Sequence, residues 1–175
     1  FNTIGLRYFN VFGPKQNANN PYAAVIPIFC KHFIEGTKPT INGDGTTSRD
    51  FTFVENAVQA NIKALFASFE NKEKFGEDSS DNNINPKLEK HQVFNVACGD
   101  QITLNQMIET VESLTQKPIK LEFANSNSSD VLITNCSPQY LVKLTNFVPK
   151  INLKEGLEEV YVWARNTVAR NKYSS

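Results

Sequence analysis

The apolar positions of this chain follow two patterns: short runs that predict strands, and longer stretches with helical spacing. The short runs mix branched, aromatic and other apolar residues and end at polar or glycine-containing segments, which is typical of largely buried strands. Strands are therefore predicted at residues 3–10, 40–42, 49–53, 92–97 and 119–123.

The helical stretches carry recognisable end signals. Thr103 with Gln106, and Asn152 with Glu155, have the spacing of a capping box. In this motif the side chain of the cap residue and that of the third helical residue each accept a hydrogen bond from the other residue's backbone amide. Gly36 is predicted to end the first helix as its C-cap. Helices are predicted at residues 24–35, 54–69 and 103–115, with a short one opening at 137–138 and a last one after 152.

Residues 70–90 interrupt this pattern. They are rich in charged residues, asparagine and serine, and offer almost nothing apolar to bury. Because such a segment cannot offset the entropy lost on ordering, we predict a mobile surface insert and not a linker between domains.

Strands alternate with helices along the chain, which predicts an α/β or α+β fold. With 175 residues and 40% hydrophobic content, the chain is long enough to bury a core as one domain with a possible second lobe.

Charge and hydropathy narrow the classes of partner. Lysine plus arginine and aspartate plus glutamate number 18 each, so there is no basic field that would attract nucleic acid. The apolar runs fall short of the roughly 20 residues that span a bilayer, and the N-terminus lacks the order of a signal peptide. We expect no nucleic acid, no membrane and a cytoplasmic location.

The cysteines and histidines predict neither a disulfide framework nor a metal site. The three cysteines are widely spaced and outside any CxxC pattern, so they are interpreted as small buried apolar groups. His32 and His91 have no partner at ligand spacing and are interpreted as surface or hydrogen-bonded side chains.

Two segments carry the most specific chemistry: GLRYFNVFGPKQ at residues 5–16 and INGDGTTSRDF at residues 41–51. The first predicts a buried strand that breaks at a Gly-Pro turn. The second places a glycine turn before Arg49, whose side chain would point into the cleft that the turn lines. In this order, with YAAVIP between them, they resemble the extended short-chain dehydrogenase/reductase family, and within it the UDP-N-acetylhexosamine, UDP-glucose and UDP-glucuronate 4-epimerases.

The resemblance covers only the C-terminal half of that family. The glycine-rich dinucleotide loop is missing from the sequence, because Gly43 and Gly45 have neither its spacing nor its setting. The family's base is a tyrosine followed four residues later by a lysine, and no tyrosine here has that partner. We therefore predict no catalytic residue in this chain, and neither activity nor NAD retention by these 175 residues alone.

The resemblance implies an α/β fold in two parts. Residues 3–13, 49–69 and 92–116 would be remnants of a Rossmann domain with a parallel sheet. Residues 14–48 and 117–170 would form a small α+β substrate-binding lobe, with 70–90 as the insert.

The resemblance also assigns residues of the first segment. Asn10 would face the sugar-diphosphate; alternatively its amide caps the backbone at the Gly13-Pro14 turn. Tyr8 would lie by the nicotinamide of NAD, or else belong to the core. Ala24 and Val25 would begin a helix whose free amides approach the diphosphate, although they also suit an ordinary helix.

In the second segment, Asn42 would contact the uracil and Arg49 would grip the diphosphate, for which a planar guanidinium is well suited. The alternative for Arg49 is a salt bridge to Asp44 or Asp50. In a third region the family commonly has an arginine, a spacer, glycine and aspartate, then often valine and arginine. Here Asp130 matches as a possible ribose ligand, but the glycine and both arginines are replaced.

These assignments predict the UDP-sugar-binding portion of an NAD-dependent 4-epimerase, which moves hydride from sugar C4 to NAD and back to the opposite face. The intact enzyme is a possible homodimer. Two alternatives stay open: a dehydratase, decarboxylase or reductase of the same family, and a degenerate protein that binds a nucleotide or another subunit without catalysis.

Overall fold

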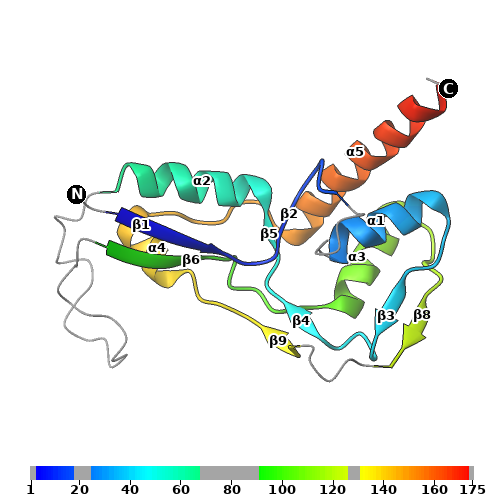
Figure 1. Cartoon of the computed structure of the whole chain (residues 1–175), viewed down its shortest axis with the longest axis horizontal. Helices are drawn as coiled ribbons and strands as arrows, with labels where there is room; N and C mark the ends of the chain where they lie inside the picture. The colour runs from blue at the N-terminus through cyan, green and yellow to red at the C-terminus, as the bar shows by residue number, and fades with distance from the viewer. Residues whose placement is uncertain (1–2, 18–24, 68–90, 126–130, 174–175) are drawn as a thin grey trace.

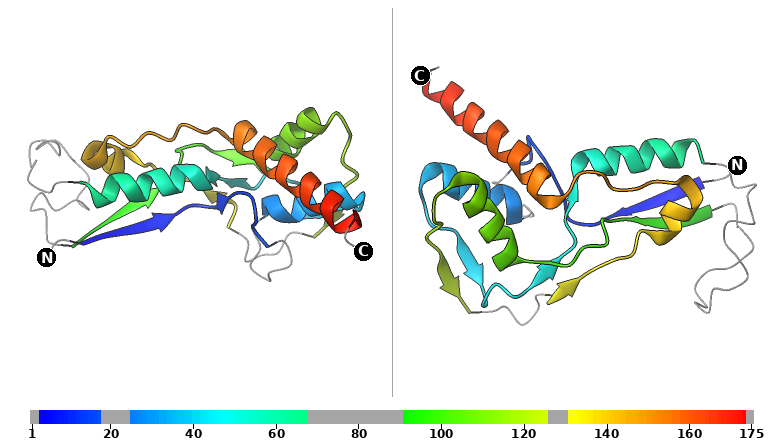
Figure 2. Two further views of the ribbon diagram at one scale, coloured as in Figure 1. Left: turned by 90° about the horizontal axis from the view of Figure 1, so that it is seen from above. Right: turned by 180° about the vertical axis from the view of Figure 1, so that it is seen from behind.

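The computed structural model describes residues 3–17, 25–67, 91–125 and 131–173. It has an elongated shape, with β1, β6, α2 and α4 at one end and α1, α3 and α5 at the other (Figure 1). The last helix extends away from the body and carries the C-terminus (Figures 1 and 2).

The first end of the molecule is built on a parallel strand pair. β1 (Thr3–Tyr8) pairs with β6 (His91–Val96) in register from Thr3 opposite His91 to Tyr8 opposite Val96. One face of this pair packs against α2 (Val54–Leu65) and α4 (Gln139–Thr145). The buried residues of this cluster are Ala57, Ala60, Phe94, Val96, Leu141, Leu144 and Phe147.

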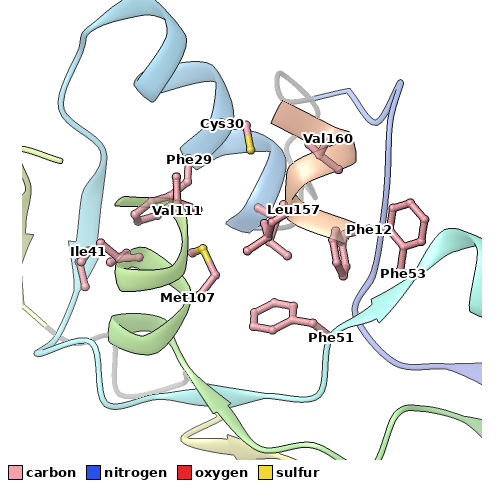
Figure 3. Packing of buried hydrophobic residues seen from close by; sticks show 12 residues of the cluster. Phe12, Phe29, Cys30, Ile41, Phe51, Phe53, Met107, Val111, Leu157 and Val160 are labelled. Atoms are coloured by element: carbon pink, nitrogen blue, oxygen red, sulfur yellow. The ribbon is translucent and has the colours of Figure 1, made fainter. Parts of the chain in front are cut away.

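The second end is held by a larger apolar cluster between α1 (Val25–Glu35), α3 (Leu104–Thr115) and α5 (Leu153–Tyr173). β2 (Val11–Phe12) pairs in parallel with β5 (Thr52–Phe53) beside it. Figure 3 shows Phe12 of β2 between Phe53 of β5 and Leu157 of α5, with Phe51, which precedes β5, below them. Edge-to-face packing of Phe12 on Phe53, with ring centroids 5.5 Å apart, joins β2 to β5 here.

The remaining short strands surround the glycine turn. β3 (Thr40–Asn42) pairs in parallel with β8 (Glu122–Ala124). β4 (Ser48–Arg49) lies between β7 (Ile102–Thr103), which is antiparallel to it, and β9 (Ile133–Thr134), which is parallel.

The helix ends predicted at Thr103, Asn152 and Gly36 are confirmed, whereas the helix expected at 54–69 already ends at Leu65. The Thr103 hydroxyl accepts from the Gln106 amide at 3.1 Å while Gln106 Oε1 accepts from the Thr103 amide at 2.9 Å. Asn152 and Glu155 exchange the equivalent pair of bonds at the start of α5. Gly36 follows α1 with φ +70°, the left-handed conformation expected of a C-cap.

Two predicted strands are divided. The strand expected at 3–10 ends at Tyr8, because Asn10 turns into the left-handed region at φ +37° before β2 resumes. The strand expected at 49–53 is interrupted at Asp50, whose side chain points into a hydrogen-bond network and separates β4 from β5.

The strand expected at 119–123 lies three residues later, at Glu122–Ala124. The amide of Ile119 donates to the carboxylate of Glu112 on α3 at 2.7 Å, and Ile119 and Leu121 pack against the helical cluster. Residues 119–121 therefore contact α3, and only the residues after them pair with β3. The predicted insert at 70–90, Ala24 and Asp130 lie outside the described residues.

Each of the two apolar clusters contains elements from both of the predicted parts, the Rossmann remnant and the substrate-binding lobe. α3, from the segment assigned to the Rossmann remnant, packs with α1 and α5. α4, from the segment assigned to the substrate lobe, packs with β1, β6 and α2. The boundaries of the two parts therefore stay a prediction, while the α/β class with parallel strand pairing is confirmed.

Candidate functional site

Asn10 and the Arg49 segment are brought together by a direct hydrogen bond. The side-chain amide of Asn10 donates to the carbonyl oxygen of Asp50 at 2.9 Å, and the Asn10 carbonyl accepts from the Thr52 amide at 3.4 Å. The left-handed backbone of Asn10 directs its side chain across to this neighbouring strand. The amide nitrogen thus has a structural role, as the alternative interpretation expected, but its partner is Asp50 and not the Gly13-Pro14 turn.

Asp50 fixes the segment from the other side. Its side chain is fully buried, and its two carboxylate oxygens accept from the backbone amides of Cys98 at 3.0 Å and Gly99 at 2.9 Å. Burial raises the pKa of this carboxyl above its ordinary value, although the two amide bonds oppose the shift. One sequence signal points to this residue, a charged side chain inside an otherwise apolar strand, but the sequence analysis considered it only as the salt-bridge alternative for Arg49.

Arg49 has no carboxylate partner within the described part of the chain. Its Nη1 donates to the carbonyl oxygens of Ser48 at 2.8 Å and Leu132 at 3.5 Å. Asp50 is occupied by the two amides, and Asp44 accepts from the amide and hydroxyl of Thr46. The salt-bridge alternative is therefore wrong for both carboxylates, and the half-buried guanidinium keeps donors for a ligand.

The third predicted contact region also reaches Arg49. The amide of Ser48 donates to Leu132 O at 2.9 Å, and the amide of Asp50 donates to Thr134 O at 2.9 Å. These bonds hold the segment that begins at Val131 along β4. The described residues that follow Asp130 in the sequence, from Val131 to Thr134, therefore lie beside Arg49.

Asn42 lies at the end of β3, exposed, where the glycine turn begins. Gly43 and Gly45 both have positive φ, +79° and +78°, so the turn requires glycine at these positions. Hydrogen bonds from Thr46 to Asp44 lower the pKa of that carboxyl. Asn42 is thus held on a well-defined turn that leads into β4, the strand that carries Arg49.

The remaining predicted residues lie apart. Val25 is the first residue of α1 and packs, half-buried, against the helical cluster. Tyr8 is 51% exposed, and its hydroxyl donates to Asn61 on α2 at 2.9 Å. Tyr8 is therefore not a core residue.

A groove lies between α1, α5 and the loop after β2, with a volume of about 370 Å³ and largely apolar walls that include Pro27, Ile34, Trp163 and Ala164. None of the predicted binding residues lines it. We do not assign this groove to the candidate site.

The cysteines follow the prediction only in part. Cys30 is buried, and burial raises the pKa of its thiol to about 11. Cys98 and Cys136 are only half-buried, so for them the interpretation as buried groups is wrong.

Across the described ranges no cluster of three or more histidine, cysteine, aspartate or glutamate side chains could hold a metal ion, and no helix there is long and apolar enough to cross a membrane.

Comparison with known proteins shows a similarity to one family and to several of its relatives. Residues 1–76 match the model of the NAD dependent epimerase/dehydratase family. The chain is 29% identical to UDP-glucuronate 4-epimerase of Thermodesulfobacterium geofontis, over 93% of this chain and 43% of that protein. It is 27% identical to UDP-N-acetyl-alpha-D-glucosaminuronate decarboxylase of Bacillus cytotoxicus, over 91% of this chain and 45% of that protein.

Solved structures agree with this match. UDP-N-acetylglucosamine 4-epimerase from Methanobrevibacter ruminantium, in complex with UDP-N-acetylmuramic acid, superposes with a TM-score of 0.75 at 31% identity, over 95% of this chain and 46% of that one. UDP-glucuronic acid 4-epimerase from Bacillus cereus, in complex with UDP-glucuronic acid and NAD, superposes with a TM-score of 0.72 at 25% identity, over 93% of this chain and 45% of that one. The chain thus spans less than half the length of these relatives, and over residues 1–76 it is similar to the NAD dependent epimerase/dehydratase family.

Proposed function

We propose that this chain is the C-terminal, UDP-sugar-binding portion of an NAD-dependent nucleotide-sugar 4-epimerase. The observation that carries the proposal is Arg49: the residue is half-buried, and its guanidinium has no carboxylate partner in the described residues and donates only to the carbonyl oxygens of Ser48 and Leu132 among them. The names of the similar proteins, most of which act on or bind UDP-sugars, support it.

The proposed roles follow the chemistry of each group. The Arg49 fork binds diphosphate oxygens, since a guanidinium presents paired donors that match them. Asn10 supports that segment through its side-chain amide nitrogen and offers its side-chain oxygen as an acceptor to a hydroxyl of the sugar-diphosphate's sugar. Asn42 contacts the uracil, Ala24 and Val25 contact the diphosphate, and Asp130 binds the ribose.

The residues of this chain do not fit NAD by themselves. A dinucleotide site needs closely approaching backbone amides of a glycine-rich loop, and neither Gly43 nor Gly45 precedes a helix in that way. Tyr8, the residue predicted beside the nicotinamide, bonds Asn61. The contribution of this chain to catalysis is therefore to position the sugar through its nucleotide.

A related decarboxylase is the second candidate for the intact enzyme, because one of the similar proteins is a UDP-N-acetyl-alpha-D-glucosaminuronate decarboxylase. The residues that bind UDP would be the same in both cases. Decarboxylation releases CO₂ from a uronic acid sugar, whereas epimerisation conserves it, so product analysis of the intact enzyme distinguishes the two. A degenerate non-catalytic protein would bind UDP or a subunit and turn over neither sugar.

Calorimetric titration of UDP tests the site. Losing one or more charge-assisted bonds of about 1.5–3 kcal/mol should weaken UDP binding roughly 10- to 150-fold in Arg49→Ala, with Arg49→Lys in between. Lys38→Ala is the matched control, since it removes a cation whose ion pair with Glu122 lies on the surface. Equal affinity of wild type and Arg49→Ala would contradict the diphosphate role.

A further inference from the structure

The glycine turn at residues 43–47 is docked on the N-terminus of α3 (Figure 1). The amide of Asn105 donates to Gly45 O at 3.1 Å, and the amide of Leu104 donates to Thr47 O at 3.0 Å. These two residues are the first of α3, and the first amides of a helix have no acceptor within it. The carbonyl oxygens of the turn supply the acceptors, so the turn and the helix complete each other's hydrogen bonds.

The side chain of Asn105 adds a third bond and packs against the backbone of the turn. Its Nδ2 donates to Asp44 O at 3.2 Å. Gly45 is buried, and a Cβ at this position would clash with the Asn105 side chain. Asn105 therefore connects the turn to α3 at two points, through its backbone amide and through its side-chain amide.

The strand that carries Arg49 is held independently of the Asn105 side chain. β7, which leads directly into α3, pairs antiparallel with β4, so that Arg49 lies opposite Ile102 and Ser48 opposite Thr103. On its other side β4 pairs in parallel with β9. Arg49 is thus fixed by a strand on each side, and neither pairing involves the side chain of Asn105.

Asn42 is held less directly. It is exposed at the end of β3, where it pairs with Ala124 of β8. The next amide, that of Gly43, donates to Ala124 O at 2.9 Å. From there the chain passes through the turn to Arg49, which is seven positions after Asn42 in the sequence. The position of Asn42 relative to Arg49 therefore depends on the bonds that join the turn to α3.

We infer that Asn105 is a positioning residue for nucleotide binding, which holds the turn so that Asn42 and Arg49 contact one UDP molecule together. A loop that is already fixed in its binding conformation loses less freedom when the ligand binds, and contact residues need such support from the residues behind them. The inference rests on the proposed function, in which Asn42 contacts the uracil and Arg49 the diphosphate. It goes beyond that function because Asn105 is not one of the proposed contacts.

Calorimetric titration of UDP into wild type, Asn105→Ala, Asn42→Ala and the double variant tests the inference. Asn105→Ala should weaken UDP binding about three- to tenfold, the effect of one neutral hydrogen bond. The further loss should be less than twofold when Asn42 is already alanine, because the effects of residues that act through one another are not additive. Asn166→Ala makes the same change at an exposed position of α5 and should bind UDP as wild type does.

Hydrogen exchange gives a readout that needs no ligand. In Asn105→Ala the amides of Gly43 and Thr46 should exchange at least threefold faster, because the turn opens more often. The amides of Ser48 and Asp50, which donate to Leu132 O and Thr134 O, should keep their wild-type rates. Faster exchange at all four amides would indicate a general loss of stability and would overturn the positioning role.

The outcomes separate this inference from the proposed function. If Arg49→Ala weakens UDP binding but Asn105→Ala does not, the proposed function stands and the inference is overturned. An equal loss with and without Asn42 would also overturn it, since Asn105 would then act by another route. Absence of UDP binding by wild type would overturn the proposed function, and the inference with it.

Discussion

At the scale of single residues, Asp50 determines whether the candidate site keeps its shape. Asp50→Ala would remove the acceptor of the Cys98 and Gly99 amides, at up to about 1–3 kcal/mol for each amide that water cannot reach. Asp50→Asn keeps one acceptor oxygen and should cost less. Urea unfolding measures the loss of unfolding free energy in both variants. A loss under about 0.5 kcal/mol in Asp50→Ala, well below the cost of even one unsatisfied amide, would show that the carboxylate does not hold the segment.

The same residue gives a pH dependence with a definite sign. Since burial raises the folded-state pKa of Asp50, its contribution to the free energy of unfolding is fully present below the unfolded pKa and is lost as pH rises through the folded value. This part of the pH dependence should disappear in Asp50→Asn, which has no proton to lose. Unfolding curves of both proteins between acid and neutral pH provide the comparison.

At the scale of elements, α5 packs closely against Phe12 of β2 and Phe53 of β5 because Gly156 has no side chain. A Cβ at Gly156 would lie 2.7 Å from Phe53 Cδ2 and 2.8 Å from Phe12 Cζ. Alanine normally stabilises a helix by up to about 1 kcal/mol relative to glycine, but here overpacking should dominate and Gly156→Ala should destabilise by about 1–3 kcal/mol. Glu158→Ala, at an exposed position of the same helix, serves as control, and thermal unfolding of the two gives the answer. Stabilisation by Gly156→Ala would contradict the packing.

The elements also explain what the sequence could predict. The caps at Thr103 and Asn152 form between residues three apart, so local spacing was sufficient. The position of β8 depends on Glu112 binding Ile119, and the break at Asp50 depends on amides 48 and 49 residues away. For the site, the sequence placed Asn10 and Arg49 in separate strands. Their connection through the backbone of Asp50 follows from long-range pairing that a linear pattern does not contain.

At the scale of the whole molecule, we predict that these 175 residues alone have no 4-epimerase activity and retain no NAD. Hydride transfer needs a bound dinucleotide and a base near the sugar hydroxyl. The sequence has no glycine loop and no tyrosine with a lysine four residues later, and the candidate site offers binding groups only.

The measurement is turnover of UDP-N-acetylglucosamine and UDP-glucose by the purified chain, together with the absorbance and mass of any bound dinucleotide. Turnover, or NAD present in equal amount to the protein, would contradict the prediction. UDP binding without turnover is the expected result, because the Arg49 segment is held by contacts within this chain: Asn10 at one side, the amides of Cys98 and Gly99 at another, and Leu132 along β4. Binding and chemistry would then reside in separate parts of the architecture.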